Sequence, residues 1–325
     1  MKRSGPLFLT AAFALAGSSV ISARLLSGHL GTFTITAVSL GLALLALLPL
    51  CRGKLMQNLR CMSVSSGIML VLQAFFGIFL FRLLLLQGMA QTSTAEAGLL
   101  TGATPAVTAA LAWVFLKERI SPRGLIGIVC TVAGVLLIQG LTAGRMISAD
   151  HLWGNLLVLG AASSESVFNI LSRISAVKAE QTKPLDPFVQ TAFVSALALL
   201  FCIVPMLLEQ PLTGLGAIGL TQWLALVWYG VVVTALAFIC WYAGIKRCSA
   251  GTAAAFTGLM PFTSLVLSVL LLGEQAGAAQ WAGGALVIGG MVLIGTKKEK
   301  ASRSDMKYID KQVSSDHAEK MSKND

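Results

Sequence analysis

The chain has 325 residues, of which 56% are hydrophobic and only 12% are charged, and its mean hydropathy is +0.80. Soluble domains carry about 25% charged residues, so this composition excludes a soluble protein. The formal net charge is +10, but the cations lie in short clusters between apolar segments. That distribution excludes nucleic acid as the expected partner and makes membrane lipids the predicted surroundings.

Ten apolar segments follow one another along the chain, each with the length of a helix that crosses a bilayer. They span residues 6–25, 31–50, 64–86, 93–116, 123–140, 152–172, 188–208, 221–244, 250–272 and 280–296. Residues 297–325 then change to a mixed-charge sequence with few apolar residues. We expect this last segment to be a disordered tail in water.

The distribution of lysine and arginine predicts the orientation, because basic loops stay on the cytoplasmic side of a membrane. With the N-terminus in the cytoplasm, the outer connections hold only Arg24 and Arg145, and Arg82 lies within a span. Every other lysine and arginine then falls on the cytoplasmic side. The sequence therefore predicts that both termini are cytoplasmic, in a multi-pass protein of the cell membrane, with the bacterial inner membrane favoured.

The second half of the sequence repeats the first at a shift of 156 residues. The shift superposes, without a gap, Gly88 on Gly244, Thr101 on Thr257, Gly102 on Gly258, Pro105 on Pro261, Glu118 on Glu274, Gly127 on Gly283 and Gly134 on Gly290. Similar composition explains matched leucines, but it does not align proline, glutamate and glycines in one register.

Each repeat contains five predicted spans, so the second copy must enter the membrane from the opposite side. The predicted fold is all-α, with ten transmembrane helices arranged as two inverted five-helix repeats. The first repeat covers residues 1–140, an outer connection covers 141–151, the second repeat covers 152–296, and the tail covers 297–325. Inverted repeats are a common construction of secondary transporters, whose substrates bind near the membrane midplane.

The repeated segments resemble the EamA-type transporters of the drug/metabolite transporter superfamily. Residues 92–140, with Pro105 and the sequence Lys117-Glu118-Arg119, are similar to the first repeat of that family. Residues 248–295, with Pro261 and Gly273-Glu274, are similar to the second. The resemblance implies a ten-helix carrier that moves small metabolites, often outward, without ATP. The chain departs from the family at Glu165, where an aromatic residue is common.

Charged groups inside hydrocarbon cost at least about 2.5–3.5 kcal/mol near mid-span, so each one needs a partner or a water-filled site. Arg82 and Glu96 each lie seven residues from Met89, the centre of an outer turn, and could pair at the same depth. They could form a static ion pair or a gate, and Arg82 could instead bind a substrate carboxylate. Gln73 is a weaker candidate for the same pathway.

Glu165 lies about 20 Å from the outer end of its predicted span, and Asn169 follows on the same helix face. Ser163, Ser164 and Ser166 are expected to surround the carboxyl group. We expect Glu165 to face a central cavity and to bind a proton or a cationic substrate group. The alternative is a neutral, hydrogen-bonded carboxyl with a structural role.

Pro105 and Pro261 lie within matched spans, where each removes one backbone hydrogen bond. They could be packing kinks or hinges between the halves. Glu118 and Glu274 follow these spans and are expected to be interfacial helix-end caps. The glycines of residues 283–290 permit close helix packing, and a monomer or a homodimer is compatible with them.

No catalytic triad order, HExxH, phosphate-binding loop or metal-ligand cluster occurs in the sequence. We therefore expect no metal, no cofactor and no enzymatic reaction. The predicted function is secondary active transport, with export favoured, of a small polar or amphipathic metabolite such as an amino-acid-like compound or a drug. Protons are the candidate coupling ion. The alternatives are an intramembrane enzyme and a non-transporting structural membrane protein.

Overall fold

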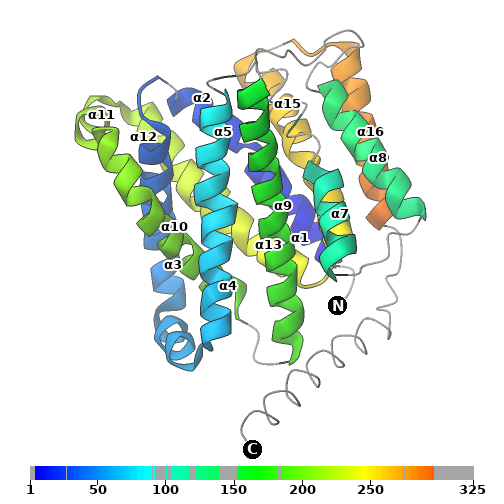
Figure 1. Ribbon diagram of the computed structural model, residues 1–325. Helices are drawn as coiled ribbons and strands as arrows, with labels where there is room; N and C mark the ends of the chain where they lie inside the picture. The colour runs from blue at the N-terminus through cyan, green and yellow to red at the C-terminus, as the bar shows by residue number, and fades with distance from the viewer. Residues whose placement is uncertain are drawn as a thin grey trace, which may run out of the picture.

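The computed structural model describes residues 4–26, 28–89, 91, 100, 104–116, 122–138, 152–181, 185–273 and 275–295 (Figure 1). Secondary structure in these residues is entirely helical. The first half contains α1 (Ser4–Gly17), α2 (Ser19–Leu26), α3 (Thr32–Cys61), α4 (Val64–Ala74), η1 (Phe75–Leu80), α5 (Phe81–Met89), α7 (Thr104–Leu116) and α8 (Pro122–Ile138). The connection 141–151 and the tail 297–325 lie outside the described residues.

The second half contains α9 (Leu152–Gln181), α10 (Pro187–Leu208), α11 (Pro211–Ala217), α12 (Leu220–Val227), η3 (Trp228–Leu236), α13 (Ala237–Ile245), α14 (Ala250–Phe256), α15 (Leu259–Leu272) and α16 (Ala278–Gly295). The elements η1 and η3 are π-helical and continue the helices on either side of them.

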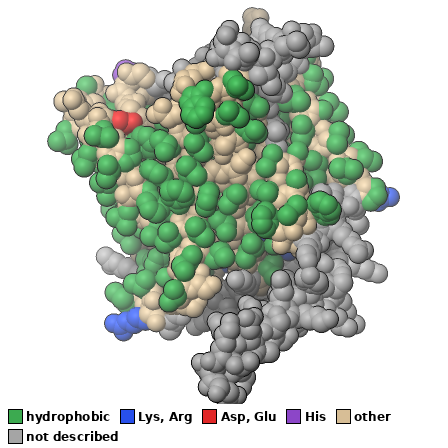
Figure 2. Space-filling model, in the orientation of Figure 1, with side chains coloured by type: hydrophobic (Ala, Val, Ile, Leu, Met, Phe, Trp, Pro, Cys, Tyr) green, Lys and Arg blue, Asp and Glu red, His purple; other side chains and the backbone are tan. Residues whose placement is uncertain are grey.

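Five described runs are long and apolar enough to cross a membrane: Thr32–Cys51, Val64–Gly88, Pro187–Leu208, Leu220–Ile245 and Ala250–Leu271. Four shorter apolar helices accompany them in the described part of the chain, at Ser4–Gly17, Thr104–Leu116, Pro122–Ile138 and Ala278–Leu293. Hydrophobic side chains cover most of the broad face in Figure 2, and charged side chains appear at its edges. This surface is that of a multi-pass membrane protein, because lipid chains accept apolar side chains as readily as a protein core does.

The helices are arranged with one closely packed pair at each side and the other helices between them (Figure 1). At one side α3 packs against α10, and at the other α8 packs against α16. Between these pairs, α9 packs against α5 and α7 of the first half. In the same way, α1 packs against α13 and α15 of the second half. Each half therefore covers the other half's first helix.

The contact between α8 and α16 depends on glycines. A methyl carbon added at Gly134 would lie 2.5 Å from the carbonyl oxygen of Gly283. One added at Gly290 would lie 2.6 Å from the carbonyl oxygen of Gly127. Backbones that approach this closely gain dispersion contacts that lipid does not replace, and only glycine permits the approach.

The pair formed by α3 and α10 is joined by polar contacts at both ends. At the upper end in Figure 1, the Glu209 carboxylate accepts hydrogen bonds from the backbone N–H groups of Phe33 and Thr34, at 3.1 and 2.7 Å, and from the Thr34 hydroxyl at 2.8 Å. These donors belong to the first turn of α3, whose N–H groups have no partner within the helix. A carboxylate at this position is also favoured by the helix dipole.

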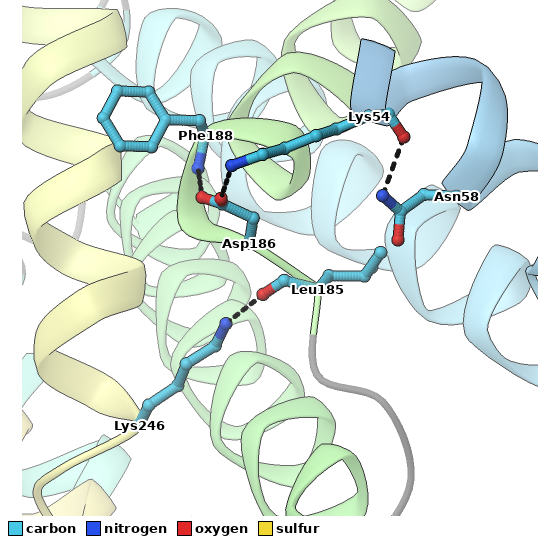
Figure 3. A network of polar contacts seen from close by, with 6 residues as sticks. All are labelled: Lys54, Asn58, Leu185, Asp186, Phe188 and Lys246. Carbon is cyan, nitrogen blue, oxygen red and sulfur yellow. Dashed lines mark hydrogen bonds and ion pairs between the residues drawn. The ribbon is translucent and has the colours of Figure 1, made fainter.

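At the lower end, Asp186 caps α10 by accepting from the Phe188 N–H at 3.1 Å, and it pairs with the Lys54 ammonium at 2.7 Å (Figure 3). Partial burial opposes ionisation of the carboxyl, but the bonds from Lys54 and Phe188 outweigh it and lower the pKa of Asp186. Lys246, just past α13, donates to the Leu185 carbonyl, and burial lowers the pKa of this lysine to about 8. The network therefore joins α3, α10 and α13.

The helix that contains the second predicted span is longer than that span. Helix α3 continues to Cys61, about eleven residues past the predicted end of the span at residue 50. Residues 51–61 are polar enough to lie outside hydrocarbon, and α3 keeps its helical hydrogen bonds there in place of a loop. The change in polarity after residue 50 therefore does not mark the end of the helix.

Gly134→Ala should destabilise the protein, because the added methyl group overlaps the backbone of α16. Overpacking costs about 1–3 kcal/mol, and the higher helix propensity of alanine offsets about 1 kcal/mol of this. Thermal unfolding of the detergent-solubilised protein measures the effect. The control is Gly289→Ala, because no described atom lies within 4 Å of the added carbon. An equal loss in the two variants would contradict the packing role of Gly134.

Asp186→Ala should also lower the thermal stability, by about 1 kcal/mol, because α10 loses its N-cap. Lys54→Ala should have a smaller effect, because the Lys54 side chain is 62% exposed and its ion pair is screened by water. Since the pKa of Asp186 is lowered on folding, its contribution is present at neutral pH and is lost as the pH falls below about 4. Both variants remove the ion pair, so an equal loss for Lys54→Ala and Asp186→Ala would show that the cap contributes nothing.

Candidate functional site

Arg82 connects the two halves inside the bundle. Its guanidinium group donates a hydrogen bond to the phenol oxygen of Tyr229, and its Cζ atom lies 5.2 Å from the centroid of the same ring. Arg82 is half-buried on α5, and Tyr229 is buried on η3. Tyr229 therefore makes two interactions with the guanidinium group: its hydroxyl accepts a hydrogen bond, and its ring makes a cation–π contact. Glu96, the predicted partner of Arg82, lies outside the described residues.

Gln73, at the end of α4, is the centre of a second polar contact between the halves. Its side-chain oxygen accepts from the Tyr242 hydroxyl at 3.1 Å and from the Gln190 amide at 3.2 Å. All three side chains are buried. The Gln73 amide nitrogen has no hydrogen-bond partner among the described residues. If the Gln73 amide were rotated by 180°, its oxygen would replace its nitrogen as the atom without a partner. In either orientation, one polar atom of this amide can still form a hydrogen bond.

Aromatic rings surround this contact. Phe168 on α9 stacks on Trp241 with ring centroids 5.9 Å apart, and it lies 6.5 Å from the Tyr242 ring. Phe13 of α1 meets the Trp241 ring edge-on at 5.5 Å. The Trp241 indole N–H is also buried without a partner in the described part of the chain. An unpaired buried donor costs about 1–3 kcal/mol, so two of them in one region point to a ligand or an internal water.

Glu165 lies in the middle of α9 and is half-buried. The Thr104 side chain, at the start of the described part of α7, lies beside its carboxyl group. The three serines predicted to surround Glu165 direct their hydroxyl protons elsewhere. Those of Ser163 and Ser166 bond to carbonyls one turn earlier in α9, and that of Ser164 bonds to the Phe76 carbonyl at 2.8 Å. The carboxyl group is therefore not stabilised by these hydroxyls.

Asn169 is buried and faces α7. Its amide nitrogen lies 3.4 Å from the Thr108 hydroxyl oxygen, and this hydroxyl in turn bonds to Ser166 at 3.0 Å. Asn169 therefore joins α9 to α7 through a chain of polar side chains. The sequence predicts that Asn169 and Glu165 lie on one helix face. In the structure both lie beside α7, Asn169 at Thr108 and Glu165 at Thr104.

Pro261 lies just after a break in a predicted continuous span. Helix α14 ends at Phe256 and α15 begins at Leu259, with Thr257 and Gly258 between them. The proline has no N–H group to donate to the carbonyl of Thr257, four residues earlier, and its ring crowds that carbonyl. The Met260 N–H bonds to it at 3.1 Å instead. Pro105, its counterpart in the repeat, is the second described residue of α7.

Three of the predicted site residues, Glu96, Glu118 and Glu274, lie outside the described residues. The gate and the two helix-end caps therefore stay predictions.

Tyr229, Tyr242 and Glu209 were missed by the sequence reasoning, which followed charges inside spans and gave no weight to tyrosine. One signal could have found Tyr229, because the shift of 156 residues superposes Gln73 on it. No such signal marked Glu209, because its partners in α3 are about 175 residues away in the chain.

The described residues contain no group of histidine, cysteine and carboxylate side chains suited to a metal. A groove of about 420 Å³ between α7 and α8 is lined by apolar residues such as Ala106, Ala109, Leu125 and Val132, so it is suited to lipid and not to a polar molecule. Gln73 is buried and Arg82 and Glu165 are half-buried, so polar side chains from separate helices lie inside the bundle.

Comparison with known proteins identifies the fold and the family. The chain is 30% identical over 299 residues to an uncharacterized transporter of Bacillus subtilis, YetK, covering 90% of this chain and 87% of that protein. It is 27% identical over 220 residues to the aromatic amino acid exporter YddG of Ancylobacter novellus, covering 67% of this chain and 71% of that one. A crystal structure that is 21% identical shares the fold with a TM-score of 0.71, over 89% of this chain and 96% of its own.

The model of the EamA-like transporter family matches twice, over residues 3–140 and 152–296. These two matches cover nearly all of the helical part of the chain. The protein therefore belongs to the EamA-like transporter family.

Proposed function

We propose that this protein is a secondary active transporter that exports a small polar or amphipathic metabolite by alternating access. The observation that carries the proposal is the set of polar side chains that both family-matched segments contribute to the interior of the bundle, represented by Gln73, Arg82, Glu165 and Tyr242. Each such group is costly to place in hydrocarbon, so polar side chains inside a membrane bundle often mark the path of a substrate or an ion.

The architecture that we propose for this transport is the predicted one of ten spans in two inverted repeats with cytoplasmic termini. Its support is a pattern of exchanged contacts. Gly134 meets Gly283 and Gly127 meets Gly290, and the shift of 156 residues converts each pair into the other. Contacts of this kind are expected where a two-fold axis relates two copies. Likewise, α5 packs on the first helix of the second half, and α13 packs on the first helix of the first half.

The substrate class that fits the interior is an amino-acid-like compound with an apolar part. The Glu165 carboxyl offers a partner to an amino group or a proton, and the buried Gln73 and Trp241 donors offer partners to a carboxylate or carbonyl. Rings such as Phe168 and Phe238 offer contact to an apolar side chain. Relatives named as amino-acid exporters add support to this class. Arg82 is a weaker anchor for the substrate, because Tyr229 already occupies it.

The break between α14 and α15 is the second feature that favours transport over the alternatives. Interrupted helices in membranes occur where backbone groups line a polar path or where a helix must bend. An intramembrane enzyme or a structural protein stays the alternative, and flux separates the three. A protein with either alternative role should move no small molecule through a vesicle membrane.

The first test compares metabolites inside and outside cells that overexpress or lack the protein. At least one amino-acid-like compound should accumulate outside the overexpressing cells and inside the deletion strain. The same compound should then cross vesicles that contain the purified protein and not empty vesicles. Unchanged metabolites in both strains would remove the main support for export.

Glu165→Gln should abolish the effect of a pH gradient on transport while the protein still folds, because glutamine keeps the shape of the side chain and cannot exchange a proton. The measurement is substrate flux in vesicles with and without a gradient. Glu209→Gln is the matched control, because this carboxyl belongs to the contact between α10 and α3. Equal stimulation by the gradient in Glu165→Gln and wild-type vesicles would exclude Glu165 as the coupling group.

A further inference from the structure

The third membrane-crossing helix of each half has the same construction. Residues 64–89 form α4, η1 and α5, and residues 220–245 form α12, η3 and α13, so the shift of 156 residues superposes their two ends. Each contains a π-helical segment near its middle, at Phe75–Leu80 and at Trp228–Leu236. These segments overlap under the same shift. A π-helical turn is less stable than an α-helical one and is often found at functional sites.

Two polar contacts join these helices, and each uses one residue of each half. Arg82 of the first half donates to Tyr229 of the second. Tyr242 of the second half donates to Gln73 of the first, at 3.1 Å. The two acceptors, Gln73 and Tyr229, are superposed by the shift of 156 residues. The two donors are one helical turn apart under that shift.

The two contacts lie at different depths in the bundle. Tyr229 is nine residues after the start of α12 at Leu220, and Arg82 is seven residues before the end of α5 at Met89. Both of these helix ends lie at the upper side of Figure 1. Gln73 and Tyr242 lie nearer the opposite helix ends, at Val64 and Ile245, on the lower side. We call Arg82–Tyr229 the outer latch and Gln73–Tyr242 the inner latch, after the predicted orientation.

Side chains, and not packed backbones, make these connections. In the described residues α5 packs mainly against α9 and η1, whereas η3 packs mainly against α3, α13, α12, α1 and α2. Likewise, α4 packs mainly against α10, η1 and α9, and α13 packs mainly against α1, α10 and η3. Because long side chains bridge helices that are otherwise held by different neighbours, a latch can break without loss of a packed interface.

We propose that the two latches alternate during transport. The protein opens its outer side when Arg82 leaves Tyr229, and it opens its inner side when Tyr242 leaves Gln73, with one latch kept in each case. Both are made in this structure, which is the arrangement of a form closed to both sides. This inference rests on the proposed transport function, and it assigns the closing of each side to named residues.

Cys202 can report on the outer latch. It is fully buried on α10, and its thiol lies near enough to Arg82 to be influenced by that charge. The experiment uses a variant in which Cys202 is the only cysteine, and a membrane-impermeant maleimide added from the outer side. Labelling is slow while the latch is made. The variant must keep the thermal stability of the wild type.

Tyr229→Phe removes the hydroxyl group of the outer latch and keeps the ring. Since a hydrogen bond from a charged group shifts a two-state equilibrium by about tenfold to a hundredfold, labelling of Cys202 should accelerate by a factor in that range. Tyr242→Phe should not accelerate it, because loss of the inner latch favours opening to the other side. Arg82→Gln is an independent variant of the outer latch and should behave like Tyr229→Phe.

Thr234→Val is the matched control. Its hydroxyl bonds to the Tyr229 carbonyl at 2.9 Å within η3, so its loss loosens the same π-helical segment without breaking a contact between halves. Labelling at the wild-type rate is expected. Acceleration in Thr234→Val or Tyr242→Phe to the level of Tyr229→Phe would show general loosening and would overturn the proposal, as would unchanged labelling in both outer-latch variants.

The labelling needs no substrate, so its outcome is independent of transport. Changed labelling in a protein that moves no metabolite would keep the two latches and remove the transport function. Flux by the wild type together with unchanged labelling would keep the transport function and remove the latches.

Discussion

Hydrogen bonds inside a hydrocarbon layer have to be made by the protein itself, because lipid chains offer neither donors nor acceptors. The rest of this structure depends on that constraint. It makes every described element helical, and it requires partners for each polar side chain at membrane depth. Arg82 is satisfied by both the hydroxyl and the ring of Tyr229, and Gln73 by Tyr242 and Gln190. The few buried donors left without described partners are then conspicuous.

The same constraint separates the bundle into two kinds of contact. At its sides, α8 and α16 approach through glycines, and α3 and α10 are joined at both ends by carboxylates. The glycine contacts pack backbone against backbone, and the carboxylates join the ends of their helices, so both pairs are firmly connected. In the centre, aromatic rings and long polar side chains from the two halves contact one another, as in the pairs Phe13–Trp241 and Arg82–Tyr229. Such side-chain contacts can be exchanged with less disruption than packed backbones.

Some features of the structure follow from chemistry that acts along the chain. Pro261 has no N–H group, and the helix is interrupted at Thr257, whose carbonyl that group would otherwise bond. The partners of side chains do not follow from the chain in this way. The serines beside Glu165 bond to backbone carbonyls, and Asn169 bonds to Thr108. A helix face defines a direction, but the neighbour that lies in that direction depends on helices distant in the chain.

The sequence by itself determined the membrane class and indicated the family, because hydropathy and short motifs are properties of consecutive residues. Its family resemblance is confirmed by the two matches to the EamA-like model. Only the tertiary structure decided the partners of the polar groups: Tyr229 for Arg82, Tyr242 for Gln73, and the first turn of α3 for Glu209. These partners are separated by about 147 to 176 residues, so no local pattern could indicate them.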